Sequence, residues 1–207
     1  MKDLIAFASY VRPEVPGCPE IQILDAIRRS GAEFCMRTSV SRQTVSVVTA
    51  PGVSSYDLVG LLPTGFMPDK VQRVQDSTMQ YLQAASEEEF DRRFLRTQSG
   101  TPRYYYLDGS QLVVGYKPTG VDTLTVRVKT RVSEAATQLP DELYERYHEE
   151  IAAGAKKVLM MMANTPWSNI QQAGIYKGMY DEAIDIENLR YAKGGGSRTL
   201  RTKLHIF

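Results

Sequence analysis

The spacing of apolar residues predicts two long helices in different parts of the chain. A helix tolerates proline at its first position and favours an acidic residue in its first turn, so Pro19 and Glu20 indicate a start. Apolar side chains then recur every three or four residues, which predicts a helix over residues 19–37. The same spacing returns after Pro140, where a helix of more than twenty residues is expected. Its apolar stripe consists of Leu143, Tyr147, Ile151, Ala155, Val158 and Met162.

A third helix and a tail complete the chain. Ser168 and Gln171 have the spacing of a capping box, which favours a helix start after the break at Pro166. The apolar positions that indicate this helix are Ile170, Ala173, Met179, Ala183, Ile186 and Leu189. Three glycines, 194–196, should end it. Residues 197–207 then alternate apolar and polar side chains, which is typical of a strand, although no neighbouring strand follows the glycine hinge.

Between the first two helices the apolar period shortens and turn residues become frequent. The clearest hairpin is residues 103–116 around Asp108-Gly109. In the strand that follows, apolar residues alternate with Thr125, Arg127, Lys129 and Arg131, so one face should be apolar and the other basic. Weaker patterns predict short strands over 40–63 and an extended pair over 71–82, and a capping box at residues 86–89 predicts a short helix.

These elements predict an α+β fold. We expect a helical bundle, made of the N-terminal helix, the long helix and the C-terminal helix, with an inserted small antiparallel β domain and an extended C-terminal tail. The helical core would comprise residues 1–38 and 139–193. The β-rich insertion, with its short helix, would comprise residues 39–138, and residues 194–207 would form a flexible assembly arm.

The chain is nearly neutral overall but uneven in charge along its length. Its 207 residues hold 25 Lys and Arg against 24 Asp and Glu, so total charge indicates no particular partner. No acidic residue follows Glu187, and the tail is basic. The helix after Pro140 begins with a concentration of acids opposed only by Arg146, namely Asp141, Glu142, Glu145, Glu149 and Glu150.

No spacing of reactive residues indicates an enzyme, a cofactor or a metal. Cys18 and Cys35 would be too far apart on a helix for a disulfide, and with His148 and His205 they lack the spacing of a zinc site. The histidines are also too scattered to serve a nucleophile. The apolar run over residues 4–8 is too short for a signal peptide, and no segment could span a membrane. We expect a soluble intracellular protein without catalytic, cofactor-binding or metal-binding residues and without a membrane partner.

Several short motifs follow one another in a fixed order around the predicted sheet. They are Val15-Pro16-Gly17-Cys18-Pro19-Glu20, Ala26, Arg28, Glu33-Phe34-Cys35, Thr38, Leu139-Pro140-Asp141, Glu150-Ile151-Ala152, Gly154-Ala155 and Pro166-Trp167-Ser168. Over residues 15–192 this combination resembles the head-to-tail adaptor (connector) proteins of tailed bacteriophages. The resemblance implies a structural virion protein that forms a ring, typically dodecameric, beneath the portal. The ring would join the portal to the tail and leave a channel for DNA during genome ejection.

The resemblance also implies the partners. They would be the portal protein, a downstream tail or nozzle protein and other copies of this chain, while DNA would only pass through without specific binding. The protein would be made in the host cytoplasm and reside in the neck of the virion. The near-neutral total charge would then combine two oppositely charged surfaces on one subunit, which suits stacking between other rings.

Two groups of residues are candidate sites for this role. An acidic helix face suits a channel wall, since like charge disfavours adhesion to DNA phosphates; its residues would be Asp141, Glu142, Glu145 and Glu149. The alternating tail could add a strand to a sheet of the portal or of a neighbouring subunit. The residues of this arm would be Arg198, Leu200, Arg201, Thr202, Lys203, Leu204, Ile206 and Phe207.

A DNA-binding or packaging accessory protein is the alternative. The basic strand face and the basic tail could meet phosphates, and Tyr104-Tyr105-Tyr106 could stack on bases. Strand geometry would send Tyr105 to one face and its two neighbours to the other, however, which favours packing and an interface. Strongly salt-dependent binding to isolated DNA would distinguish this alternative from an adaptor.

Overall fold

The structure is a computed structural model that describes residues 1–93, 95 and 97–193. The chain divides into two compact units. One unit contains residues 1–40 and the chain from Thr137 onward, and the other contains residues 41–136. The predicted assembly arm, residues 194–207, lies outside the described residues.

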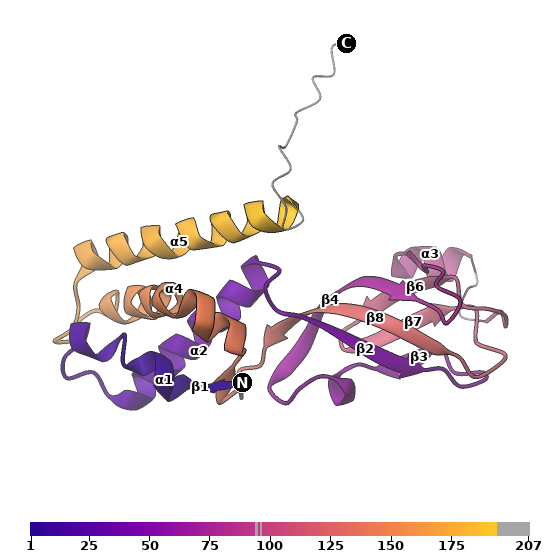
Figure 1. Ribbon diagram of the computed structural model, residues 1–207, viewed down its shortest axis with the longest axis horizontal. Helices are drawn as coiled ribbons and strands as arrows, with labels where there is room; N and C mark the ends of the chain where they lie inside the picture. Colours follow the sequence, from indigo (N-terminus) through magenta and orange to yellow (C-terminus); the bar gives the residue numbers. More distant parts are fainter. Residues whose placement is uncertain (94, 96, 194–207) are drawn as a thin grey trace, which may run out of the picture. The chain divides into compact units, whose positions relative to one another are not determined.

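The first unit is helical, with one small sheet. Figure 1 shows α5 lying along α4, and α4 also packs against α2. The sheet pairs β1 (Lys2–Asp3) with β9 (Gln138–Leu139) in antiparallel register. The helices are α1 (Leu4–Ala8), the short 3-10 helix η1 (Arg12–Glu14), α2 (Glu20–Arg37), α4 (Asp141–Met160) and α5 (Ile170–Ala192).

The three long helices exist as predicted, but details of two of them need correction. The helix expected over 19–37 is α2, which begins after Pro19. The helix expected after Pro140 is α4, but it has 20 residues, not more, and its φ/ψ values leave the helical range at Tyr147. The capping box predicted at Ser168 and Gln171 is wrong by one residue, since the Asn169 side chain accepts the backbone N–H of Gln172.

Glycine allows α4 to approach the rest of the helical unit closely. A Cβ atom added at Gly154 would lie 2.7 Å from Cε2 of Tyr180 and 3.0 Å from Cβ of Ser30. The fully buried Tyr180 ring therefore occupies the space that a larger residue on α4 would need. Its hydroxyl donates to the backbone carbonyl of Ser30 at 2.6 Å, so one α5 side chain links all three long helices.

The second unit contains two larger sheets. The three-stranded sheet has the order β2 (Arg42–Val48), β8 (Thr123–Val132), β4 (Phe66–Gln75) and is antiparallel throughout. The four-stranded sheet has the order β3 (Ser55–Asp57), β7 (Gln111–Gly115), β6 (Tyr104–Asp108), β5 (Gln83–Ala84). The remaining elements are the 3-10 helix η2 (Val59–Leu61) and helix α3 (Glu87–Arg92).

Local signals in this unit are largely confirmed. Helix α3 starts at the predicted capping box, in which the Ser86 side chain accepts from Glu89 and the Glu89 carboxylate accepts from the Ser86 backbone. Strand β8 alternates buried and less buried residues as expected. The hairpin exists, but the pairing of Asp108 with Gln111 makes Gly109 and Ser110 its turn residues, with Gly109 at φ +57°.

The predicted fold class is wrong, because the β-rich part is not a small insertion in a helical bundle. The described chain is a mixed α/β protein with five α-helices and three sheets. Strands β4 and β8 are ten residues each, where the sequence pattern favoured shorter pieces. Strand β8 pairs with β2 and β4 and not with the hairpin, and β5 runs parallel to β6, so the β part is not purely antiparallel.

Candidate assembly surfaces

Helix α5 has two apolar faces, and the subunit covers only one of them. The covered face contains Ala173, Tyr180, Ala183, Ile184 and the carboxylate of Glu187. The second face, which we call the α5 stripe, is exposed to solvent. Its residues are Ile175, Met179, Ile186 and Leu189, with exposed fractions of 61%, 49%, 50% and 52%.

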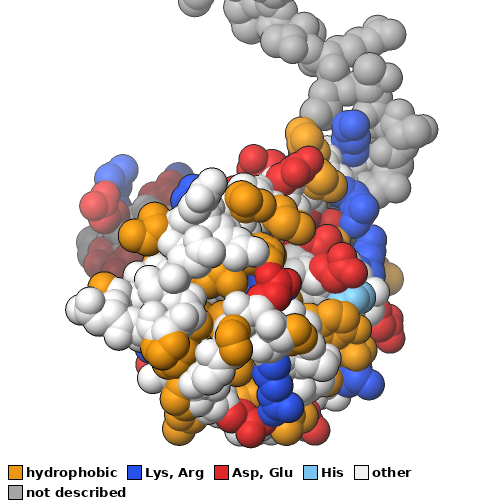
Figure 2. All heavy atoms as spheres, turned by 90° about the vertical axis from the view of Figure 1, so that its left-hand side faces the viewer, with side chains coloured by type: hydrophobic (Ala, Val, Ile, Leu, Met, Phe, Trp, Pro, Cys, Tyr) orange, Lys and Arg blue, Asp and Glu red, His pale blue; other side chains and the backbone are white. Residues whose placement is uncertain are grey.

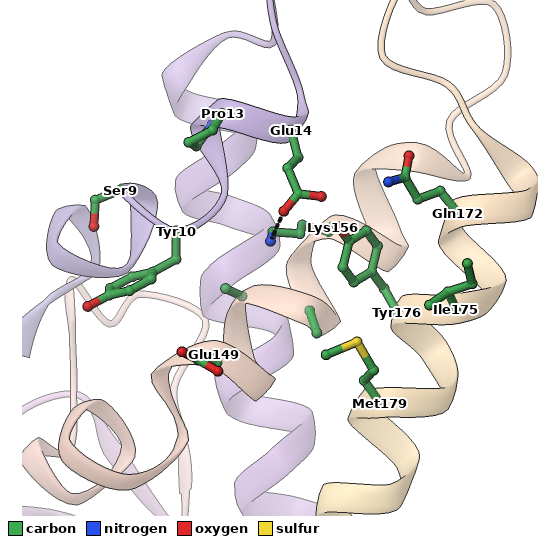
Figure 3. A pocket seen from close by; sticks show the side chains of 12 residues that line it. Ser9, Tyr10, Pro13, Glu14, Glu149, Lys156, Gln172, Ile175, Tyr176 and Met179 are labelled. Carbon is green, nitrogen blue, oxygen red and sulfur yellow. Dashed lines mark hydrogen bonds and ion pairs between the residues drawn. The ribbon is translucent and has the colours of Figure 1, made fainter.

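The helical repeat places the α5 stripe well away from the covered face. At about 100° per residue, its four residues fall within a sector of roughly 80°, centred about 130° from the middle of the covered face. A helix that is apolar on most sides is normally surrounded by other protein. Within the described subunit the four residues of the α5 stripe stay about half exposed or more, although Ile175 and Met179 also line a groove of the subunit (Figure 3).

The subunit holds α5 firmly through a buried polar cluster. The Tyr147 hydroxyl donates to the Glu187 carboxylate, and Arg190 donates to both groups at 3.0 and 2.9 Å. Burial and the neighbouring Glu187 raise the pKa of Tyr147 to about 12. An isolated carboxylate would be costly to bury, so this cluster fixes the rotation of α5 on α4.

A second attachment lies on the α2 side of α5. Asp181 accepts from Lys177 at 2.8 Å and from Arg37 of α2 at 2.7 Å. These two cations hold the pKa of Asp181 below its usual value. The attachments together determine which side of α5 faces outward.

A groove runs beside α5 and is bounded by the segment after α1 and by α4 (Figure 3). Its volume is about 590 Å³. Lys156 lines it and is buried, with its ammonium 2.6 Å from the Glu14 carboxylate and 4.9 Å from the centre of the Tyr176 ring. Glu14 therefore neutralises the charge of this lysine.

A second groove, the α2 groove, lies between the first half of α2 and the end of α4. Its volume is about 440 Å³. Val158 and Met162 line it from the α4 side, and Ile21, exposed at 77%, lies on the α2 side. Val158 points about 140° around α4 from Ala153, which lines the groove beside α5. The two grooves therefore occupy different sides of the helical unit.

Apolar side chains also reach the surface at the end of the helical unit where α4 gives way to α5. Figure 2 looks onto this end and shows hydrophobic side chains in several patches between acidic and basic ones. Ile170 is 78% exposed and Met161 is 61% exposed. The α5 stripe is thus one part of a helical unit that exposes much apolar surface.

The four predicted channel acids all lie on the exposed side of α4. Asp141 pairs with the chain's amino terminus at 2.5 Å, and Glu142 pairs with Arg146 at 3.0 Å. Glu149 borders the groove beside α5 (Figure 3). Acids in the first turn also favour the helix dipole, which gives Asp141 and Glu142 a local role in addition to any role in a channel.

The residues that suggested nucleic-acid binding lie mostly in structural positions. Tyr105 and Tyr106 are buried, and Tyr106 packs with Phe90, so the preference for packing over base stacking is confirmed for these two. Lys129 pairs with Asp69 at 3.2 Å. Arg127 and Arg131 remain exposed on β8.

No reactive cluster accompanies these surfaces in the part of the chain that the structure describes. His148 bonds the backbone carbonyl of Tyr144 through Nδ1 at 2.8 Å and stacks near Tyr10, which is a structural position. No group of three or more His, Cys, Asp or Glu among the described residues could hold a metal ion. None of the helices described is both long and apolar enough to cross a bilayer.

The predicted contacts of the assembly arm, residues 198–207, lie outside the described residues. The sequence did not predict the α5 stripe, although the signal was present: apolar residues occur on all sides of the predicted third helix. Ile170, Met179, Ile186 and Leu189 helped to indicate that helix, yet the subunit buries none of them.

An exposed apolar helix face is typical of a protein that assembles with others. Comparison with family models gives the particular class: the model of the SU10 adaptor protein family matches residues 2–202, so the chain belongs to this family. No curated protein matches the chain. The expected resemblance to phage head-to-tail adaptors is confirmed, and the match extends beyond the predicted residues 15–192. The protein therefore has a structural role as a phage adaptor.

Proposed function

We propose that the protein forms a ring between the portal and the tail of a tailed phage and leaves a channel for DNA. Membership of an adaptor family supports the position between portal and tail. The observation that carries the ring is the exposed α5 stripe, because large apolar side chains gathered on one exposed helix face are normally covered in the assembled state. A dodecamer is the stoichiometry that the family resemblance implies.

The proposed partners are the portal on one side, a downstream tail or nozzle protein on the other, and further copies of the chain. The C-terminal arm would add a strand to the portal or to a neighbouring subunit. Its support is the alternation of Leu200, Thr202, Leu204 and Ile206 in the sequence. Backbone hydrogen bonds would provide the affinity, and the alternate side chains would fix the register.

The channel is proposed to be lined by the exposed acids of α4, which are Asp141, Glu142, Glu145 and Glu149. Negative charge repels DNA phosphates, so the DNA would pass through the channel without adhering to its wall. Two of these acids have a cationic partner within the subunit, so Glu145 and Glu149 would contribute most of the repulsion. A structure of the assembly with Glu145 and Glu149 on the outer surface would contradict this assignment.

Negative-stain imaging of the protein mixed with purified portal rings tests the proposal. A ring of added density beneath the portal is expected, and an undecorated portal would contradict the adaptor position. A variant truncated after Gly194 tests the arm. We expect it to attach to the portal more weakly than the full chain, and unchanged attachment would refute the role of the arm.

A DNA-binding accessory protein is the competing proposal, supported by the exposed Arg127 and Arg131. Such a protein would bind isolated duplex DNA with an affinity that falls steeply as salt rises. The adaptor proposal expects little binding at physiological salt, both for the chain and for an Arg127→Ala variant. Tight, salt-dependent binding that is lost in this variant would favour the competitor.

A further inference from the structure

We propose that the α5 stripe of one subunit packs into the α2 groove of the next copy of the chain. This interface rests on the proposed ring and adds which two surfaces form it. Both surfaces belong to the same helical unit, so every copy presents one of each. A groove between two helices is a natural seat for the ridge of a third.

The two surfaces match in apolar character. The stripe offers aliphatic side chains on both sides of Glu182, with Ile186 and Leu189 toward the C-terminal end of α5, and the groove offers Val158, Met162 and the strongly exposed Ile21. Leu189 and Ile21 gain little from the subunit's own core. Covering both patches at once removes apolar surface from water on two sides of every subunit.

Charge complements this apolar match. Glu182 and Asp185 are exposed; by the helical repeat Glu182 lies within the stripe, between Met179 and Ile186, and Asp185 lies beside it. The groove is bordered by Arg28 and Arg29, which share the single carboxylate of Asp25 at 3.3 and 2.8 Å. The lining of the groove thus holds two arginines and one carboxylate, a formal charge of +1, which suits the acidic side chains of α5. A second copy of this chain therefore fits better than a partner of unrelated charge.

The geometry makes the contact head-to-tail. Two stripe residues, Ile175 and Met179, line the groove beside α5, which occupies a different side of the helical unit from the α2 groove. A two-fold pair would have to bring both surfaces of each subunit into one contact region, so their separation favours a head-to-tail contact. Repetition of the contact closes a ring when the rotation per subunit divides a full turn. The inferred interface is therefore of the kind that the proposed function needs.

The test uses two full-length variants that each damage one surface. Ile186→Asp places a charge on the stripe, and Ile21→Asp places one in the groove. Because each buries an unpaired carboxylate at the contact, self-association should weaken more than about 100-fold for either variant alone. Val121→Asp, at an apolar residue of the β-rich unit that is 73% exposed, is the matched control and should assemble like wild type.

Mixing gives the decisive result. The intact stripe of the Ile21→Asp variant can still enter the intact groove of the Ile186→Asp variant, so an equimolar mixture should form 1:1 dimers by native mass spectrometry and nothing larger. Circular dichroism should show that both variants remain folded. Absence of dimers in the mixture, or wild-type rings from either variant alone, would overturn the interface.

A charge exchange gives an independent measurement. Arg29→Glu should weaken assembly, and adding Glu182→Arg to the same chain should restore part of it. No recovery, together with the absence of mixed dimers, would show that these surfaces do not meet. If wild type forms rings while these variants have no effect, only the interface fails; if wild type forms no ring alone or on the portal, the proposed function fails with it.

Discussion

Helices α4 and α5 lie side by side and have similar lengths, but they use their apolar residues differently. All the large apolar side chains of α4 are buried or half-buried within the subunit. On α5 the subunit buries only one side and leaves Ile175, Met179, Ile186 and Leu189 exposed. Packing within one subunit therefore explains the apolar residues of α4, but it explains only those on one side of α5.

This difference separates residues that fold the subunit from residues that assemble it. Substitutions where α4 meets α5 should lower the free energy of unfolding. Substitutions on the outer side of α5 should leave it unchanged and affect only association.

The largest effect on folding is expected at Gly154. Gly154→Val would push a side chain into the Tyr180 ring, where even a Cβ would lie 2.7 Å from the nearest ring carbon. We expect a loss of about 3 kcal/mol in the free energy of unfolding, measured by urea denaturation. Gly174→Ala is the control, since its Cβ meets nothing within 4 Å and alanine favours the helix by up to ~1 kcal/mol. Equal stabilities of the two variants would contradict the close packing of α4 and α5.

The next largest effect is expected at Tyr147. Tyr147→Phe removes the hydroxyl that donates to buried Glu187 and should cost about 2 kcal/mol. Its pH dependence provides a second readout. The pKa of Tyr147 is raised to about 12 from an ordinary value of 10, so the neutral form stabilises the fold below pH 10 and this stability is lost as pH rises toward 12. The variant should lose less stability over that range, and identical alkaline profiles would contradict the assignment.

A smaller effect is expected for the surface attachment at Asp181. Its pKa is lowered by Lys177 and Arg37, so its contribution is present above the ordinary value of 3.8 and is lost as pH falls through the folded-state pKa. Asp181→Asn should cost less than ~1 kcal/mol at neutral pH, because the pairs are partly exposed. Thermal melts should show this difference shrinking in acid. A stability difference between wild type and Asp181→Asn that grows in acid would contradict the lowered pKa of Asp181.

The sequence predicted features that depend on neighbouring residues and missed those that depend on distant ones. The start of α2 at Pro19 and the cap at Ser86 follow from local geometry, so both were found. The partners of β8 lie about 50 residues or more before it, and no periodicity encodes which strands will pair. The strand content of the β-rich part was underestimated for this reason.

In the candidate surfaces, too, features set by neighbouring residues could be predicted and features set by distant residues could not. Exposure of Glu145 and Glu149 follows from the helical period after Pro140, so their place on the outside of α4 could be predicted. The outward rotation of α5 could not, because Gly154, Tyr180 and Glu187 fix it from two helices. Periodicity shows that α5 is apolar on most sides but not which side the subunit covers.

The smallest effect on the subunit alone is expected on the α5 stripe. Ile186→Asp should change the free energy of unfolding of the monomer by less than ~0.5 kcal/mol, since its side chain already meets solvent. Urea denaturation of monomeric protein measures this. A loss of several kcal/mol would mean that the stripe belongs to the subunit's own core, which would remove the contrast between α4 and α5.

Oxidation of Met179 tests most directly whether the α5 stripe is an assembly surface. Mild peroxide oxidises exposed methionines, and mass spectrometry reports each site in the free subunit and in the portal-bound assembly. In the free subunit Met179 should react readily, as should Met79, which is exposed on the turn after β4. In the assembly the account predicts that Met179 is protected severalfold. Oxidation of Met179 in the assembly at the rate of the free subunit would contradict it.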